Sequence, residues 1–230
     1  MKPLLFFILL LVSHAVLAQA DNELWTRLQV NKTISKHLLF AFDYQHRRSN
    51  GTGEGKALCS EQLLNSYRLW LHYKPDSSTT IIVSPVAYFQ NHSFSINAET
   101  ATKVDDVRSM AGIAKNWRIG NAATTHRVLY EITVTGANVS APSVRHRYRL
   151  QNSFVLPLVK KGTGTVTSYQ VSNEVLFRTL NGSSGFDQNR LYNGIRLKNK
   201  HHELNAGYQL SIQKGLQVRN QFLIYLTINI

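Results

Sequence analysis

Apolar and polar residues alternate along most of this chain, and the alternation limits the folds that are open to it. In the segment at 36–48, KHLLFAFDYQHRR, every second residue from Leu38 to Tyr44 is apolar, and the residues between them include Asp43. A period of two is that of a β-strand, in which successive side chains point to opposite faces. The segment therefore predicts a strand with one apolar and one polar face.

The same period continues to the end of the chain. Further strands, most of about ten residues, are predicted at 62–73, 79–90, 104–115, 125–134, 144–158, 167–180, 189–198, 202–213 and 217–230, and the pattern is least regular at 104–119. The segment at 23–30, ELWTRLQV, resembles an additional strand. Beyond residue 20 no stretch has a comparable helical stripe, which argues against helical and alternating βαβ folds. The chain is predicted to be all-β.

The first 20 residues, MKPLLFFILLLVSHAVLAQA, have the order of a secretory signal peptide: one lysine, an apolar run over 4–12, and then small residues. The run is about half the length of a membrane-spanning helix, so we expect cleavage after residue 18, or alternatively after residue 20. The predicted division is a signal peptide at 1–18 and a mature domain at 19–230. The single cysteine, Cys59, permits no internal disulfide.

The polar faces are too basic for the interior of a water-soluble protein. The chain has 26 Lys and Arg against 13 Asp and Glu, a formal net charge of +13. Unpaired arginine is rarely tolerated in a dry core, whereas a membrane barrel turns its polar face to a lumen and its apolar face to lipid. The mean hydropathy of −0.20 is compatible with that arrangement. Because an exported chain does not ordinarily meet genomic DNA, no nucleic-acid partner is expected.

Connections of two lengths alternate along the chain. Short polar turns at 73–78, 159–164 and 198–202 separate longer loops at 49–61, 91–103, 135–143 and 181–187. This alternation is typical of bacterial outer-membrane barrels. The expected fold is a transmembrane antiparallel up-and-down β-barrel of about 10–12 strands. Since single-chain bacterial barrels have even strand numbers, we expect ten strands if 23–30 is not a full strand, and twelve if a further strand lies near 104–125.

Aromatic residues and the C-terminus support the same fold. Aromatic side chains near strand ends fit the interfacial girdles of a barrel: Phe40, Tyr44, Tyr67, Tyr73, Phe89, Tyr148, Phe154, Phe177, Tyr208 and Phe222. The last strand has one unbroken apolar face, formed by Phe222, Ile224, Leu226, Ile228 and Ile230. This face resembles the terminal signal of outer-membrane barrels, although Ile230 replaces the usual aromatic residue. The expected partners are the barrel-assembly machinery, through this face, and outer-membrane lipid and lipopolysaccharide.

Several segments carry a family resemblance: Trp25 with the following KTISKHLLFAFDYQHRR, then RHRYRL, NEVLFR, FDQNRLYNGIRL and ELNAGYQL. Together they make the mature chain similar to an uncharacterised family of bacterial outer-membrane barrels known as a domain of unknown function. The resemblance implies the fold and a location in the Gram-negative outer membrane. It implies no established activity and no catalytic residues.

The inward charges are the main functional candidate. If the apolar faces meet lipid, a ladder of charged side chains lines the lumen: Arg47, Arg68, Arg127, Glu131, Arg145, Arg147, Arg149, Glu174, Arg190 and Arg219. Arginines and carboxylates that pair across strands would largely fill a narrow lumen and have a structural role. An open, positively lined lumen would instead be a porin-like channel for small anionic solutes.

A second hypothesis is an outer-membrane hydrolase that acts on lipid or peptide at the outer rim. Asp187, Asn189 and Arg190 form a possible rim site, although Asp and Asn are also ordinary turn residues and Arg190 is placed to pair with Glu174. Nothing in the sequence marks a nucleophile or base, so no catalytic residue is assigned. No cofactor is expected, and the histidines lack metal-ligand spacing. A soluble secreted β-protein is the third alternative.

Overall fold

A computed structural model describes residues 21–50, 59, 61–93, 102–136, 142–160, 162, 164–180 and 182–230. The predicted signal peptide at 1–18 lies outside the described residues. Most residues of the predicted loops at 49–61, 91–103 and 135–143 also lie outside them. In the part of the chain that the structure describes, no helical segment has the length and hydropathy of a membrane span.

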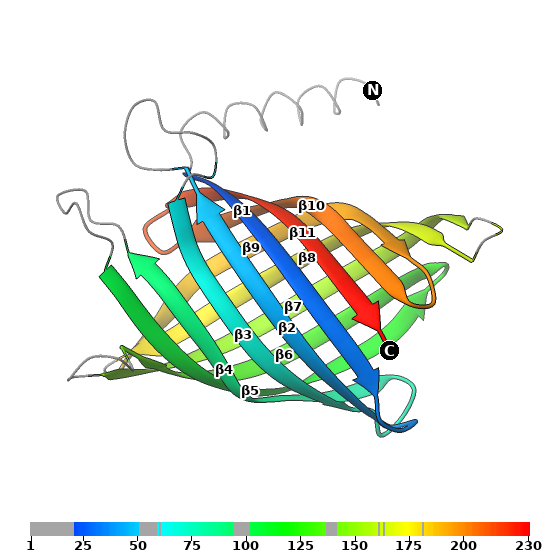
Figure 1. Cartoon of the computed structure of the whole chain (residues 1–230), viewed down its shortest axis with the longest axis horizontal. Helices are drawn as coiled ribbons and strands as arrows, with labels where there is room; N and C mark the ends of the chain where they lie inside the picture. The colour runs from blue at the N-terminus through cyan, green and yellow to red at the C-terminus, as the bar shows by residue number, and fades with distance from the viewer. Residues whose placement is uncertain are drawn as a thin grey trace.

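The described part of the chain forms eleven β-strands, which run obliquely around a common axis (Figure 1). Their bounds are β1 Asp21–Thr33, β2 Leu38–Ser49, β3 Glu61–Tyr73, β4 Thr79–Ser93, β5 Thr102–Ile119, β6 Ala122–Thr135, β7 Ser143–Lys160, β8 Val166–Leu180, β9 Ser183–Lys198, β10 His202–Gln213 and β11 Val218–Asn229. The prediction of an all-β chain is confirmed.

The strands close into a barrel in which each strand pairs with its neighbours in sequence, and β1 pairs with β11. All neighbouring pairs are antiparallel except the closing pair, which is parallel from Asp21↔Arg219 to Asn31↔Asn229. Eleven strands fall within the predicted range, but the expectation of an even number is wrong. With an odd number the first and last strands run in the same direction, so they can close the ring only as a parallel pair. The segment at 23–30, which resembles an additional strand in the sequence, is the middle of β1.

The two ends of the barrel differ. Strands β2, β4, β6, β8 and β10 finish at one end, here called the loop end, where β1 begins. The odd-numbered strands, from β1 to β11, finish at the other end, here called the turn end. The expected long loop at 181–187 is wrong, because Leu180 pairs with Ser183 and β9 begins there.

One of the short turns is held together by a single carboxylate. Asp76, between β3 and β4, accepts hydrogen bonds from the hydroxyl and the amide of Ser78 and from the hydroxyl and the amide of Thr79, at 2.7–2.8 Å. These bonds, led by that from the Ser78 hydroxyl, stabilise the ionised carboxylate and lower the pKa of Asp76 below its usual value. The turn chemistry thus fixes the β3–β4 hairpin at the turn end.

Apolar side chains cover the outside of the barrel, and every strand contributes exposed large hydrophobic residues. On β7, Tyr148 and Leu150 are 50% and 43% exposed. The side chain of Arg149, between them, is only 15% exposed because it points into the lumen. Alternation along each strand therefore places apolar groups outside and polar groups inside, the reverse of a soluble barrel.

Aromatic residues form cross-strand rows on the outer face toward the loop end. The paired positions are Tyr44–Tyr67–Tyr88, Tyr130–Tyr148–Phe177–Phe186 and Tyr208–Phe222. One residue assigned to this girdle from the sequence is misplaced: Phe89 is 3% exposed and lies inside. The β3–β4 and β4–β5 registers shift around Pro85, so inward positions change from even to odd numbers along β4.

Candidate functional site

The candidate site is the lumen, which contains three successive cavities. A cavity of about 590 Å³ opens at the loop end, one of about 240 Å³ occupies the middle, and one of about 130 Å³ lies toward the turn end. Neighbouring cavities share lining residues, among them Arg47 and Arg147 for the first two and Arg68 and Arg127 for the last two. The three cavities therefore adjoin one another along the lumen, and their volumes decrease from the loop end to the turn end.

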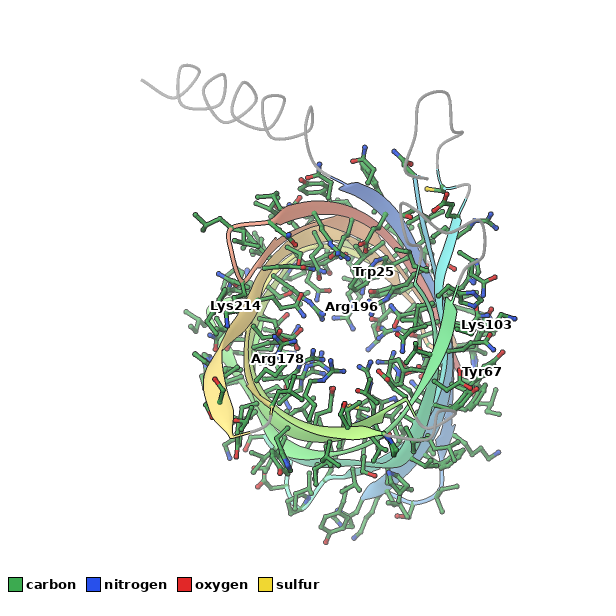
Figure 2. All side chains as sticks on the ribbon, turned by 90° about the vertical axis from the view of Figure 1, so that its left-hand side faces the viewer. Trp25, Tyr67, Lys103, Arg178, Arg196 and Lys214 are labelled. Atoms are coloured by element: carbon green, nitrogen blue, oxygen red, sulfur yellow. The ribbon has the colours of Figure 1, made fainter. Side chains whose placement is uncertain are left out.

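Positive side chains are prominent in the wall of the lumen. Figure 2, viewed from the loop end, shows Trp25, Arg178 and Arg196 inside the ring of strands and Tyr67 and Lys103 outside it. The middle cavity is lined by one carboxylate, Glu174, and by eight arginines: Arg27, Arg47, Arg68, Arg108, Arg127, Arg147, Arg149 and Arg190.

Two buried glutamates organise most of these arginines. Glu131 on β6 is 1% exposed and lies 3.4 Å from Arg108, 3.1 Å from Arg147 and 3.5 Å from Arg149. Glu174 on β8 lies 2.8 Å from Arg149 and 3.1 Å from Arg190. Arg149 bridges the two glutamates, so the charges form one network across β5 to β9.

Glu174 also forms an ion pair with Arg127 of β6, at 3.3 Å. The network continues toward the loop end, where Asp106 meets Arg108 at 2.9 Å and Arg145 at 3.6 Å. At the same end Asp187 lies 2.9 Å from Arg147. Asp187 also lies 3.6 Å from Arg178. Among the described residues this network therefore joins seven arginines to four carboxylates.

Smaller groups of polar side chains complete the lumen. Asp43 accepts hydrogen bonds from Arg68 at 2.6 Å and from the indole of Trp70 at 2.8 Å. Glu23, 2% exposed, accepts from Trp25 at 2.6 Å and from Arg219 at 3.0 Å.

Arg27 and Arg47 differ from the other lumen arginines. Among the described residues neither has a carboxylate within ion-pair distance, whereas the other lumen arginines each have one. The Nε atom of each is also buried without a hydrogen-bond partner, a feature that they share with several of the paired arginines. Their guanidinium groups stack on aromatic rings instead: Arg27 lies 4.2 Å from the ring centre of Tyr225, and Arg47 lies 3.5 Å from that of Trp25. Such stacking attracts a cation but does not neutralise it.

Part of the lumen wall is apolar. Between their inward charged residues, the inner faces of β2 to β6 carry a cluster of Ala41, Leu64, Trp70, Ile82, Ala87, Phe89, Met110, Ala114 and Leu129. Trp70, Ile82 and Leu129 border the smallest cavity, so large apolar side chains narrow the lumen toward the turn end. The predicted polar inner face therefore describes only part of the ring.

All residues of the predicted charge ladder occur in the lumen: Arg47, Arg68, Arg127, Arg145, Arg147, Arg149, Arg190 and Arg219 with Glu131 and Glu174. The possible rim site does not form. Asn189 points to the outer face, where it accepts a hydrogen bond from Asn173 at 2.6 Å, while Asp187 and Arg190 point inward to separate partners. A register shift in the β8–β9 pair places Asp187 on the lumen side.

Sequence reasoning missed several lumen residues. Arg27 and Trp25 lie on β1, which the sequence indicates only as an additional strand at 23–30. Arg108 lies on β5, where the alternation of apolar and polar residues is least regular. The pairing of Trp25 with Arg47 across β1 and β2 could not have been found without the register. The signal available was the period of two in ELWTRLQV, which puts Trp25 and Arg27 on one face.

The residue types of a hydrolase are present but do not converge into a recognisable constellation. Ser66, Ser168 and Ser172 are buried, and His72 borders the smallest cavity. No contact joins any of these serines to His72 in the part of the chain that is described. Within the same residues no group of three or more His, Cys, Asp or Glu is placed to hold a metal ion.

Comparison with known proteins places the chain in a family. The family model described as "Protein of unknown function (DUF2490)" matches residues 22–221. No curated protein matches significantly. The crystal structure of the siderophore receptor PirA from Pseudomonas aeruginosa is similar with a TM-score of 0.37 and 13% identity, over 83% of this chain and 35% of that one. This chain spans about a third of the receptor's length. Because the family model covers nearly the whole barrel, the chain belongs to the family of proteins of unknown function described as DUF2490.

Proposed function

We propose that this protein is a bacterial outer-membrane barrel that admits small anionic solutes from its loop end into an arginine-rich lumen. The observation that carries the proposal is the inversion of polarity: large apolar side chains are exposed on all eleven strands, and a network of arginines and carboxylates faces the lumen.

The outer surface supports insertion in a membrane. Exposed apolar residues occur around the whole circumference, whereas a soluble monomer rarely exposes contiguous apolar patches beyond a few hundred Å². Exposed basic residues lie beyond this belt at the turn end, where lipid headgroups would meet them: Lys32, Lys36, Lys74, Lys115, Arg118, Lys160, Lys198 and Lys200.

The predicted signal peptide and the last strand support the outer membrane in particular. In β11, Phe222 and Ile224 are 46% and 47% exposed, and Leu226 is 37% exposed. This strand therefore presents a continuous apolar face, as the predicted barrel-assembly signal requires. Its orientation, with β11 ending at the turn end, fits short turns in the periplasm and long loops outside.

Membrane insertion is tested first. The mature protein is expected to fractionate with outer membranes, to need detergent for extraction, and to migrate faster on a gel when unheated than when boiled. A mature protein that stays in the aqueous phase without detergent and shows no heat-dependent shift would overturn the membrane proposal.

Solute passage is tested in proteoliposomes. Labelled phosphate and labelled erythritol, a neutral solute of similar size, are trapped together, and their release is compared with that from protein-free vesicles. The lumen charge predicts faster release of phosphate. Equal release of both solutes contradicts anion preference, and release of neither leaves a structural barrel in place of a channel.

A further inference from the structure

Arg27 and Arg47 project into the middle of the lumen from β1, which forms one side of the β1–β11 seam, and from its neighbour β2. Trp25 pairs with Arg47 and Arg27 pairs with Gln45 in the β1–β2 register, so the two arginines lie diagonally on one inner face. Both line the cavity of about 240 Å³. Tyr225 on β11 supports Arg27 from the other side of the seam.

The nearby carboxylates are engaged with other partners. Glu174, the only carboxylate among the described residues that lines the middle cavity, lies within 3.3 Å of three other arginines. Asp43 accepts bonds from Arg68 and Trp70, and Glu23 accepts from three other side chains. The middle cavity therefore contains an excess of positive charge that the described side chains do not neutralise.

Such an excess is unfavourable in a narrow cavity. Removal of an ion from water costs several kcal/mol unless an opposite charge and hydrogen bonds compensate. The buried Nε atoms of Arg27 and Arg47 add two donors without acceptors. The stacking contacts with Trp25 and Tyr225 hold the guanidinium planes in place. One Nη of Arg47 donates a long hydrogen bond to the uncharged Oε1 of Gln45 at 3.5 Å, which leaves the positive charge without a negative partner. Fixed, unneutralised guanidinium groups are the arrangement that binds an anion.

On the basis of the proposed anion-admitting lumen, we infer that the middle cavity is a binding site for a small oxyanion with at least two negative charges, held by Arg27 and Arg47. Two unpaired cations require two charges for neutrality. Guanidinium groups match phosphate and carboxylate oxygens through paired N–H donors, which a spherical halide cannot use. The cavity is smaller than the roughly 300–1,000 Å³ of typical ligand pockets, so the anion has few heavy atoms.

Isothermal titration calorimetry on the detergent-solubilised full-length mature protein tests the site, with inorganic phosphate, sulfate and chloride as probes. We expect saturable binding of phosphate and sulfate and at least about tenfold weaker binding of chloride. The Arg27→Gln/Arg47→Gln variant is expected to lose at least about tenfold in phosphate affinity. Arg196→Gln is the matched control. Arg196 pairs with Glu203 at 2.6 Å and does not line the middle cavity, so this variant is expected to bind phosphate like wild type.

Two further measurements keep the result interpretable. The double variant lacks two unpaired cations, so its thermal stability in phosphate-free buffer should not fall below that of wild type, whereas the stabilisation of wild type by phosphate should disappear. Arg47→Lys keeps the charge but not the paired donors, and its affinity is expected to lie between those of wild type and the double variant.

The inference is overturned if chloride binds as tightly as phosphate, or if the folded double variant or Arg47→Lys binds phosphate like wild type. Anion-selective release from liposomes without saturable binding would reject this site and leave the proposed function standing. Saturable binding without release would reject passage and leave the site standing.

Discussion

Neutralising Glu131 is the perturbation to which the lumen network should respond most strongly. The carboxylate is 1% exposed, and Arg108, Arg147 and Arg149 all lie within 3.5 Å of it. Glu131→Gln keeps the size of the side chain and removes the charge. The arginines then lose one negative partner while they stay buried.

The expected loss of unfolding free energy depends on the ion pairs that the three arginines retain. Removal of one partner of a buried ion pair costs about 3–5 kcal/mol because it leaves a buried charge uncompensated. Here Arg108 retains Asp106, Arg147 retains Asp187 and Arg149 retains Glu174, at 2.8–2.9 Å. We therefore expect the lower limit, about 3 kcal/mol of unfolding free energy.

Guanidinium unfolding of the barrel in lipid vesicles measures this loss, and Glu203→Gln is the matched control. Glu203 pairs with Arg196 at 2.6 Å but is 20% exposed near the turn end, so its loss should cost at most about 1 kcal/mol. A loss below about 1 kcal/mol for Glu131→Gln, or equal losses for the two variants, would refute the view that buried carboxylates hold the arginine-rich wall together.

Three further outcomes are expected. Gly112→Ala should lower the unfolding free energy by about 1–3 kcal/mol, because a Cβ would clash with the backbone carbonyl oxygen of Val128 and would lie 2.6 Å from a side-chain carbon of Leu129. Gly185→Ala, with no atom within 4 Å of its Cβ, should have little effect, and similar losses for the two variants would contradict the packing described. Asp76→Ala should unfold more readily than wild type at neutral pH. Because the pKa of Asp76 is lowered in the folded state, the difference in unfolding free energy between wild type and variant should persist above about pH 4. In an acid titration this difference should vanish as the pH falls through the lowered pKa. Epitope tags placed before Asp21 and after Ile230 should lie on opposite sides of the membrane, with only the first detected by antibody on intact cells; detection of both or neither in folded protein would contradict an eleven-stranded barrel with its loop end outside.

Much of the fold follows from local sequence because a period of two is a property of each strand alone. The alternation around Phe42 and Asp43 predicted both β2 and the faces that its side chains occupy. Phe89 was misplaced because a bulge near Pro85 reverses the inward positions, and the alternation of residue types does not mark that change. The prediction of an even number of strands was wrong for a different reason. The parallel pairing of β1 with β11 joins residues about 200 positions apart, and no local sequence pattern indicates such a pairing.

The candidate site was predictable only in its composition. The alternating arginines of β7 predicted a charged inner face, and Glu131 and Glu174 lie on the strands on either side. Which arginines remain without a carboxylate depends on distances across the lumen. Arg27 and Arg47 could not be distinguished from their paired neighbours until those distances were known.

The reversal potential across planar bilayers tests the central claim, that the barrel admits anions because its lumen carries excess positive charge. With a gradient of potassium chloride, the wild-type barrel should give a potential of the same sign as the chloride equilibrium potential. The Arg27→Gln/Arg47→Gln variant should shift the potential toward zero, and Arg196→Gln should shift it much less. A wild-type potential of zero or of the potassium sign, or an unchanged potential in the double variant, would contradict the account.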